Sequence, residues 1–486
     1  MIKKTIFSLI TILVLAVPLM AGADQWGQNL DFFIDSSFDA SQRETLSATL
    51  QAPSLKLYFY IDDQWWDSLN GSQQDEARKS LNFLITEFES KIYPFLTATF
   101  GSEDKPGIDK DEKITVLIHP MIDNVGGYFN NADGYPKVQA PNSNEREMVY
   151  LNSSHINSSR LPSLLAHEFM HLITLNQKEK EHNVAEEIWL NELRSEYAPT
   201  FLGFDDDYEK SNLKLRVENF LNNPNNSLTD WQGKISDYGA INLFSQYLVD
   251  HYGVEILADS LHSSEAGISS IDWALKKNGF KDDFSQVFTN WTIANLVNDC
   301  SINERYCYKN ENLKDLKVAP LSNYLPLVGE SSLKFGNATQ SWSGNWQRFI
   351  GGNGKLTLLF EGSPEVDFQV PFFIETISGE SSVDFLGLSQ SQKGNLILAD
   401  FGKEIASLTI IPSIQEKTKK LDDSEPYFLF SWTASVSKQN QNSDSGNSEM
   451  TRQELEAKII EVQKKIIEAL AKLIQLLQLQ LNEYSA

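Results

Sequence analysis

One apolar segment with a short polar motif at its centre constrains this chain of 486 residues more than any other feature. Residues 161–178 have the sequence LPSLLAHEFMHLITLNQK, in which two histidines and a glutamate interrupt a nearly continuous hydrophobic run. A helix that is hydrophobic almost all round is buried, and buried histidine and glutamate side chains are costly unless something pairs them. We therefore expect this segment to be a core helix that carries a polar site.

The polar motif has the spacing of a metal site. His167 and His171 are one helical turn apart, so both lie on one face of the helix and can bind a single ion. Glu168 points about 100° round the helix, from where it can reach a water on the metal without binding the metal itself. This layout indicates a zinc-dependent hydrolase in which Glu168 acts as the general base.

A hydrolytic zinc ion needs a third protein ligand and one open position for water. The metzincin pattern requires glycine and histidine at the positions that Thr174 and Gln177 occupy here, which excludes that class. Glu192 lies on a second predicted helix, Ala185–Ala198, and the polar residues 176–183 can turn the chain back. Two helices packed antiparallel would then bring Glu192 to the histidines, so we predict it as the third ligand.

Other residues in this region have supporting or competing roles. Glu196 follows Glu192 by one turn and can accept a hydrogen bond from the distal nitrogen of a ligand histidine. Glu186 and Glu187 are rival third ligands that leave less chain for the turn. The other histidines lack ligand spacing, and we expect them to be surface or core residues: His119, His155, His182, His251 and His262.

HEFMH followed by NELRSE resembles the gluzincin metallopeptidases, the clan that includes thermolysin, in which HExxH precedes NExxSD. Asn191, Glu192 and Ser195 match that pattern, whereas Glu196 stands where thermolysin-like enzymes have aspartate. Within the clan, the chain is most similar to the hyicolysin-type neutral metallopeptidases. The shared features are an aromatic strand ending in YFYID, an acidic turn before TVLIHPM, GGYF, and DYG before a long helix, over roughly residues 55–252.

This resemblance implies an α+β fold of the zincin type, with a mixed β-sheet lobe followed by a helical lobe. It implies hydrolysis of a protein or peptide substrate, with Zn²⁺ bound by His167, His171 and Glu192 and with Asn191 and Glu196 supporting these ligands.

Gluzincins also stabilise the oxyanion with a tyrosine or histidine beyond the third ligand. Our choice is Tyr238, with His251 second and Tyr197 third. The clan further suggests that a substrate pairs with a free sheet edge, here at Lys113–His119 or Glu147–Asn152.

Composition and patterning divide the chain into five parts. Strands are expected at 55–62, 113–119 and 147–152, helices at 73–93 and over most of 161–316, and short alternating strands from about residue 333 to 436. Residues 451–486 have a 4-3 apolar repeat and are expected to form an amphipathic helix. We predict a signal peptide (1–23), a zinc metallopeptidase domain (24–327), an all-β sandwich domain (328–437), a linker (438–450) and a C-terminal amphipathic or coiled-coil helix (451–486).

The N-terminus has the pattern of an exported protein: Lys3 and Lys4 precede an apolar run, and we expect cleavage after Ala23. The protein would then be secreted or attached to the cell envelope, where Cys300 and Cys307 would form a disulfide. A zinc site on these two cysteines is the alternative, but their spacing and the lack of a nearby histidine disfavour it.

Charge and the remaining polar clusters limit the partners. A net charge of −25 makes nucleic-acid binding improbable, because phosphate groups would be repelled. Asp109 and Asp111 could bind calcium, although a solvated acidic turn is more common. Trp342, Trp346 and Trp432 could line a carbohydrate or peptide surface, but core packing is the more common use of tryptophan. Residues 451–486 are expected to self-associate or to bind an envelope partner, with a membrane surface as the weaker alternative.

These observations support a secreted zinc endopeptidase as the leading hypothesis. The first alternative is a catalytically silent binding protein of the envelope, although such a scaffold has no need of Glu168. The second is a zinc aminopeptidase, which requires an acidic group for the α-amine of the substrate that the sequence does not identify.

Overall fold

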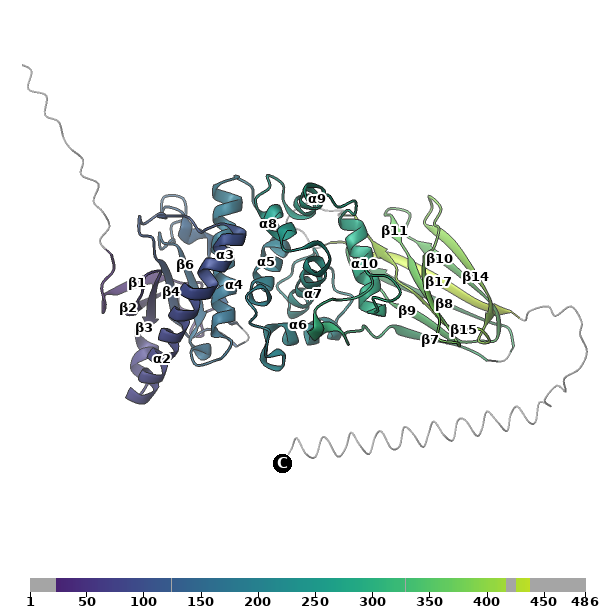
Figure 1. The fold of residues 1–486 in the computed structure, drawn as a ribbon, viewed down its shortest axis with the longest axis horizontal. Helices are drawn as coiled ribbons and strands as arrows, with labels where there is room; N and C mark the ends of the chain where they lie inside the picture. The colour runs from purple at the N-terminus through teal and green to yellow at the C-terminus, as the bar shows by residue number, and fades with distance from the viewer. Residues whose placement is uncertain (1–22, 124, 328, 417–424, 438–486) are drawn as a thin grey trace, which may run out of the picture. The chain divides into compact units, whose positions relative to one another are not determined.

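A computed structural model describes residues 23–123, 125–327, 329–416 and 425–437 of the chain (Figure 1). These residues form helices and several β-sheets, which confirms the expected α+β class. The linker at 438–450, the helix at 451–486 and nearly all of the signal peptide lie outside the described residues. These segments therefore stay predictions, together with the export and the self-association that depend on them.

The N-terminal lobe contains a six-stranded sheet in the order β1-β2-β3-β4-β6-β5. Strands β3, β4 and β6 pair in parallel and are buried along their whole length, as their continuous apolar sequences lead one to expect. The bounds are β1 Asn29–Phe33, β2 Thr45–Pro53, β3 Leu57–Asp62, β4 Ile114–His119, β5 Gly127–Tyr128 and β6 Met148–Asn152.

The free edge of this sheet differs from our expectation. β4 lies between β3 and β6, and β6 lies between β4 and the two-residue strand β5, so neither predicted edge strand is the outermost strand of the sheet. The two outermost strands are β1 and β5, and β5 pairs antiparallel with β6 on one side only and packs against α4. Two residues of the GGYF sequence, Gly127 and Tyr128, therefore form the strand that an extended peptide could join.

A long helical segment covers the sheet (Figure 1). It consists of α2 Gly71–Glu87, the π-helical turn η1 Phe88–Ile92 and α3 Tyr93–Phe100, and the separate short helix α1 Asp63–Ser68 precedes it. The sequence predicts that this helix ends at Pro94, but it continues to Phe100. Proline lacks an N–H donor and its ring clashes with the carbonyl four residues earlier, and the wider π turn that precedes Pro94 accommodates both effects.

The helical lobe begins with α4, the helix that bears HEFMH, which packs against both β6 and α5. The second helix was predicted to stop before Pro199, whereas α5 includes this proline and ends at Phe201. The bounds are α4 Leu161–Thr174, η4 Leu175–Lys180, α5 Ile188–Phe201, α6 Asn212–Asn222, α7 Ile235–Tyr252, α8 Glu255–Leu261, α9 Gly267–Lys277 and α10 Phe284–Val297.

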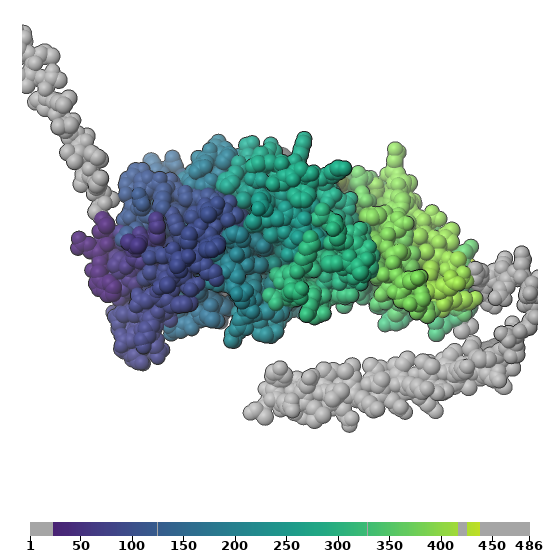
Figure 2. Space-filling model, in the orientation of Figure 1, coloured from purple at the N-terminus to yellow at the C-terminus, as the bar shows by residue number. Residues whose placement is uncertain are grey.

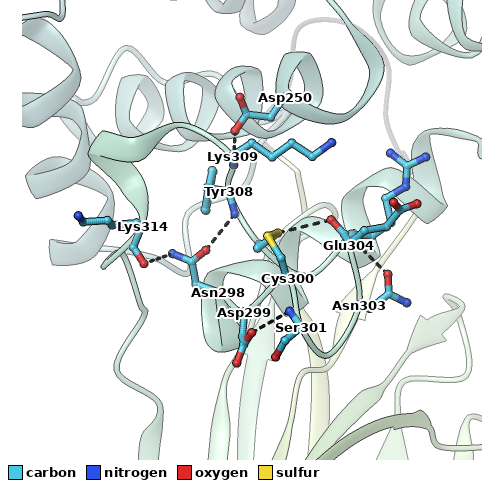
Figure 3. Close-up of a disulfide and its surroundings, with 12 residues drawn as sticks. Asp250, Asn298, Asp299, Cys300, Ser301, Asn303, Glu304, Tyr308, Lys309 and Lys314 are labelled. Carbon is cyan, nitrogen blue, oxygen red and sulfur yellow. Dashed lines mark hydrogen bonds between the residues drawn. A yellow bond between two sulfur atoms is a disulfide. The ribbon is translucent and has the colours of Figure 1, made fainter.

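A disulfide between Cys300 and Cys307 closes the loop that follows α10 (Figure 3). Asn298 ends α10 in the left-handed conformation, and its amide donates hydrogen bonds to the backbone oxygens of three residues further on. Asp250 on α7 accepts hydrogen bonds from the backbone N–H groups of Lys309 and Asn310. The loop is therefore fixed to α7 on one side and to the chain that enters the β region on the other.

The C-terminal strands form two groups around one hydrophobic core. They belong to a nine-stranded sheet in which one residue pair, Phe401 and Ile405, joins the group β14-β10-β17-β8 to the group of β13, β12, β15, β9 and β7. Side chains from both groups meet in the same cluster, and β11 and β16 pair apart from this sheet. The bounds are β7 Leu321–Leu325, β8 Ser331–Thr339, β9 Gln347–Gly351, β10 Gly354–Gly362, β11 Phe368–Gln369, β12 Pro371–Thr376, β13 Ser381–Phe385, β14 Lys393–Phe401, β15 Ile405–Ile410, β16 Ser413–Ile414 and β17 Phe428–Ser437.

All three tryptophans of this region pack in cores, which confirms that interpretation over a binding surface. Trp432 lies in the core between the strand groups, whereas Trp342 and Trp346 belong to the core of the helical lobe. The ring of Trp342 contacts those of Phe284 and Phe288, with centroids 4.8 and 5.3 Å apart. These contacts attach the strand region to α10.

Truncating Trp342 to alanine should lower the free energy of unfolding by about 3–5 kcal/mol, the usual cost of removing a large buried aromatic side chain. Trp273 on α9 is 40% exposed and offers the matched control, for which the expected loss is below about 1 kcal/mol. Urea unfolding of both variants measures the difference. Equal losses would show that Trp342 does not join the two regions.

One hydrophobic cluster extends from the N-terminal sheet through the helices to Trp342 and Trp346. In Figure 2 the blue side chains of the sheet lobe and the teal side chains of the helical lobe are in continuous contact. Helices long and apolar enough to cross a membrane do not occur in the described parts of the chain. The metal-motif helix α4 lies inside this shared core, which gives the site a rigid support.

Candidate metal centre

His167 and His171 on α4 meet Glu192 on α5. The two histidine Nε2 atoms are 3.2 Å apart, and the Glu192 carboxylate oxygens lie 3.4 Å from Nε2 of His167 and 3.7 Å from Nε2 of His171. In the described ranges, no other group of three or more potential metal ligands has donor atoms that converge in this way. The structure thus brings together the three ligands expected from the sequence.

The geometry of the group fits a zinc ion. Ligand nitrogens bound tetrahedrally at about 2.0–2.1 Å lie roughly 3.3–3.4 Å from one another, close to the separations found here. His171 keeps 7% of its side-chain surface exposed, and His167 and Glu192 keep 15% and 17%. A metal held by these atoms would therefore have one side open to water and substrate.

A polar side chain lies beside the Nδ1 atom of each imidazole ring. His171 Nδ1 lies 3.0 Å from Asn191 Oδ1 and 3.2 Å from Ser195 Oγ, and His167 Nδ1 lies 3.5 Å from a carboxylate oxygen of Glu196. Amide and carboxylate oxygens accept protons, so in the neutral form of each ring Nδ1 would carry the hydrogen and Nε2 would keep a lone pair. Both lone pairs face the group, where Glu192 Oε2 is also buried without a hydrogen-bond partner among the described residues. Such a donor set needs a cation.

Charges around the group also favour a cation. Burial alone would raise the pKa of Glu196, but Arg216, which binds both its oxygens at 2.6 and 2.7 Å, outweighs burial and lowers this pKa to about 2. Burial alone would lower the pKa of His167, but Glu192, Glu168 and Glu196 outweigh it and raise this pKa to about 9. Three carboxylates thus surround one histidine, and a divalent ion would balance them.

Glu168 lies beside the ligand group but does not belong to it. Burial raises its pKa to about 8, and the charges of Glu192 and Glu196 act in the same direction, whereas His167 opposes them. A Cβ atom at Gly127 would lie only 2.9 Å from Glu168 Oε1, so the carboxylate sits directly against the edge strand β5. Its carboxylate forms no hydrogen bond or ion pair with another residue of the described chain, which leaves it available to water.

Tyr238, the expected oxyanion donor, lies in the first turn of α7. Its ring is stacked under the guanidinium of Arg216, 4.6 Å from the ring centroid, and contacts Trp231. Burial raises the pKa of its hydroxyl, and the charges of Glu192 and Glu196 raise it further. Tyr238 is therefore connected to the candidate site through Arg216, which stacks on its ring and binds Glu196.

The two alternatives for this role lie elsewhere. His251 Nε2 is bonded to the carbonyl oxygen of Cys307 at 2.8 Å, beside the disulfide. Tyr197 is buried near Asp250 and Asp205, whose charges raise its pKa together with burial. The structure brings neither side chain to the ligand group.

The rival ligands also have other partners. Glu186 forms an ion pair with Arg194 at 2.8 Å, and Glu187 accepts a hydrogen bond from the indole of Trp189 at 2.6 Å. Asp109 and Asp111 accept hydrogen bonds from a backbone N–H and from Tyr58. Neither aspartate belongs to a converging group of three ligands in the described segments, so the structure gives no support for calcium.

Three contributors to the site were not singled out from the sequence. Arg216 holds Glu196, Phe129 stacks on His171 with ring centroids 5.9 Å apart, and Gly127 makes room for Glu168. The GGYF sequence was a usable signal for the last two, because a glycine pair before aromatic residues often marks a close backbone approach. Arg216 carries no such local signal.

Comparisons with known proteins give one informative similarity. The neutral metalloprotease ShpI of Staphylococcus hyicus is 28% identical to the chain over 240 residues, which is 43% of this chain and 51% of that protein. The chain thus spans about half the length of this curated relative. A search against models of protein families found no match.

Solved structures show only weak likeness. The Yersinia pseudotuberculosis-derived mitogen is 10% identical, with a TM-score of 0.16 over 25% of this chain and 97% of that one. A structure of infectious bursal disease virus is 12% identical, with a TM-score of 0.13 over 23% and 30% of the two chains. These scores are too low to support any inference about fold or function.

Proposed function

We propose that this chain is a zinc-dependent endopeptidase of the gluzincin type, related to the hyicolysin-type neutral metallopeptidases. The observation that carries the proposal is the convergence of His167, His171 and Glu192 beside a separate carboxylate, Glu168. The similarity to a neutral metalloprotease supports it.

Each residue of the site then has a definite task. Asn191 and Glu196 hold the imidazoles with their Nε2 lone pairs toward the ion. Zinc bound there would supply a Lewis acid that polarises the peptide carbonyl and lowers the pKa of a water to about 7. Glu168 takes the proton of the attacking water and passes it to the leaving amine. The hydroxyl of Tyr238 donates to the carbonyl oxygen as negative charge develops on it.

The edge strand β5 offers a place for the substrate backbone. It pairs with β6 on one side only, and its residue Gly127 touches Glu168. A peptide that joins this edge forms main-chain hydrogen bonds regardless of its side chains. Such pairing would carry a peptide bond past the catalytic carboxylate and suits cleavage within a chain.

We expect the zinc-loaded protein to cleave casein, and peptides with acetylated N-termini, at internal bonds. A chelator should abolish this activity and added zinc should restore it, as followed by mass spectrometry of the products. Cleavage that requires a free N-terminus would establish the aminopeptidase alternative. A zinc-containing protein that hydrolyses no member of a broad peptide library would be the catalytically silent alternative.

A further inference from the structure

Arg160 differs from every other arginine in the described chain because it has no carboxylate partner. The other seven each place a guanidinium nitrogen within 4.0 Å of a carboxylate oxygen: Arg43, Arg78, Arg146, Arg194, Arg216, Arg305 and Arg348. The net charge of −25 means that acidic side chains are abundant. An unpaired, half-buried guanidinium is therefore unexpected in this protein.

The surroundings of Arg160 leave its charge largely uncompensated. Nη2 donates one long hydrogen bond of 3.3 Å to Asn212 Oδ1, and Nε is buried without a partner in the described chain. The nearby carboxylate of Glu196 is already bound by Arg216 through both oxygens. A guanidinium with so few hydrogen-bond acceptors is costly to bury, so a ligand that pairs with the Nη nitrogens of Arg160 would be favoured.

Arg160 lies on the same side of α4 as the metal ligands. It immediately precedes the helix in a helical conformation, with φ −82° and ψ −8°. Residues 160, 164, 167 and 171 are spaced by three or four and therefore share one helix face. Along the helix axis, Arg160 is about 10 Å from His167, or roughly three residues of an extended peptide.

The edge segment beside this face fixes the direction of a bound peptide. A Cβ atom at Gly126 would lie 2.6 Å from Leu164, Gly127 meets Glu168, and Phe129 stacks on His171. The segment therefore runs in the same direction as α4. A peptide that pairs antiparallel with it runs the opposite way, and its residues after the scissile bond extend toward Arg160.

We propose that Arg160 selects substrates that carry a carboxylate on the C-terminal side of the scissile bond. The carboxylate belongs either to an acidic side chain or to the C-terminus of the substrate. The planar guanidinium fork matches a carboxylate and binds it through two parallel hydrogen bonds. This inference rests on the proposed peptidase function.

Matched peptides test the selection. Three pairs of amidated peptides carry Glu or Gln at one of the three positions after the cleaved bond, and a fourth pair differs only in a free or amidated C-terminus. We expect kcat/KM of the wild type to favour the carboxylate form by about 10- to 100-fold in at least one pair. This ratio should fall to about one in Arg160→Gln and should persist in Arg78→Gln, a control on an exposed ion pair.

Binding of the same peptides to the zinc-loaded Glu168→Gln variant, with and without Arg160→Gln, provides a readout that does not need hydrolysis. Tighter binding of the Glu peptide than of its Gln counterpart would show that Arg160 binds an acidic side chain. Tighter binding of the peptide with a free C-terminus than of the amidated one would show that Arg160 binds the terminal carboxylate. The inference would be wrong if the enzyme cleaved and bound both members of every pair equally, or if the preference for the carboxylate form persisted in Arg160→Gln. Either result would leave the peptidase function standing. Discrimination in binding that depends on Arg160, without hydrolysis of any peptide, would uphold it and contradict the peptidase function.

Discussion

Replacing Glu168 with glutamine should lower kcat for peptide hydrolysis by about 10²- to 10⁴-fold, the usual contribution of a general acid–base residue. Glutamine has the same shape but cannot take a proton from water. The zinc content should stay at the wild-type level, because Glu168 lies outside the converging ligand group. Steady-state kinetics and zinc analysis of the same preparation measure both effects.

The matched control for this variant is Glu179→Gln. Glu179 lies in η4 shortly after α4 and accepts a hydrogen bond from the hydroxyl of Tyr135, away from the ligand group. Its replacement should leave both hydrolysis and zinc content unchanged. A Glu168→Gln protein that hydrolyses peptides at the wild-type rate would exclude Glu168 as the base, and one that loses its zinc would make Glu168 a ligand.

Loss of a residue that only supports a ligand typically weakens metal binding by about 10- to 100-fold. Glu192→Gln should weaken zinc binding by more than this. Glu192 supplies the oxygen donors of the group, and an amide is a poorer ligand than a carboxylate for a divalent ion. Hydrolysis at limiting zinc should fall in parallel. Competition with a chromogenic chelator measures the zinc affinity of each variant.

Two neighbouring variants calibrate this effect. Asn191→Ala removes the acceptor 3.0 Å from His171 Nδ1 and should show the smaller loss of about 10- to 100-fold. Glu187→Gln, at the residue before α5, keeps an oxygen for the indole of Trp189 and should bind zinc as the wild type does. If Glu187→Gln lost its zinc while Glu192→Gln kept it, the ligand assignment would be wrong.

The convergence of the three candidate ligands could be predicted because the information is local. His167 and His171 are fixed by helical periodicity within one segment, and Glu192 follows from a second helix joined by a short polar turn. The strands at 57–62, 114–119 and 148–152 were recognisable for the same reason, since continuous apolar runs form buried parallel strands.

The rest of the site depends on contacts between distant segments, which a single sequence does not encode in any spacing. Arg216 reaches Glu196 from another helix, and Gly127 meets Glu168 from a strand far earlier in the chain. The predicted helix ends at Pro94 and Pro199 were wrong because a proline usually ends a helix, and contacts elsewhere in the structure override that local tendency. The turn η1 accommodates Pro94, and Pro199 lies inside α5 where neighbouring helices hold that helix in place.

Diffraction from crystals of the zinc-loaded protein, recorded at the zinc absorption edge, tests the central claim most directly. We predict one anomalous peak in the catalytic region, about 2.0–2.2 Å from Nε2 of His167, Nε2 of His171 and the Glu192 carboxylate, with the carboxylate of Glu168 outside bonding distance. A peak at any other set of ligands, or bonding of the ion by Glu168 in place of Glu192, would contradict the account.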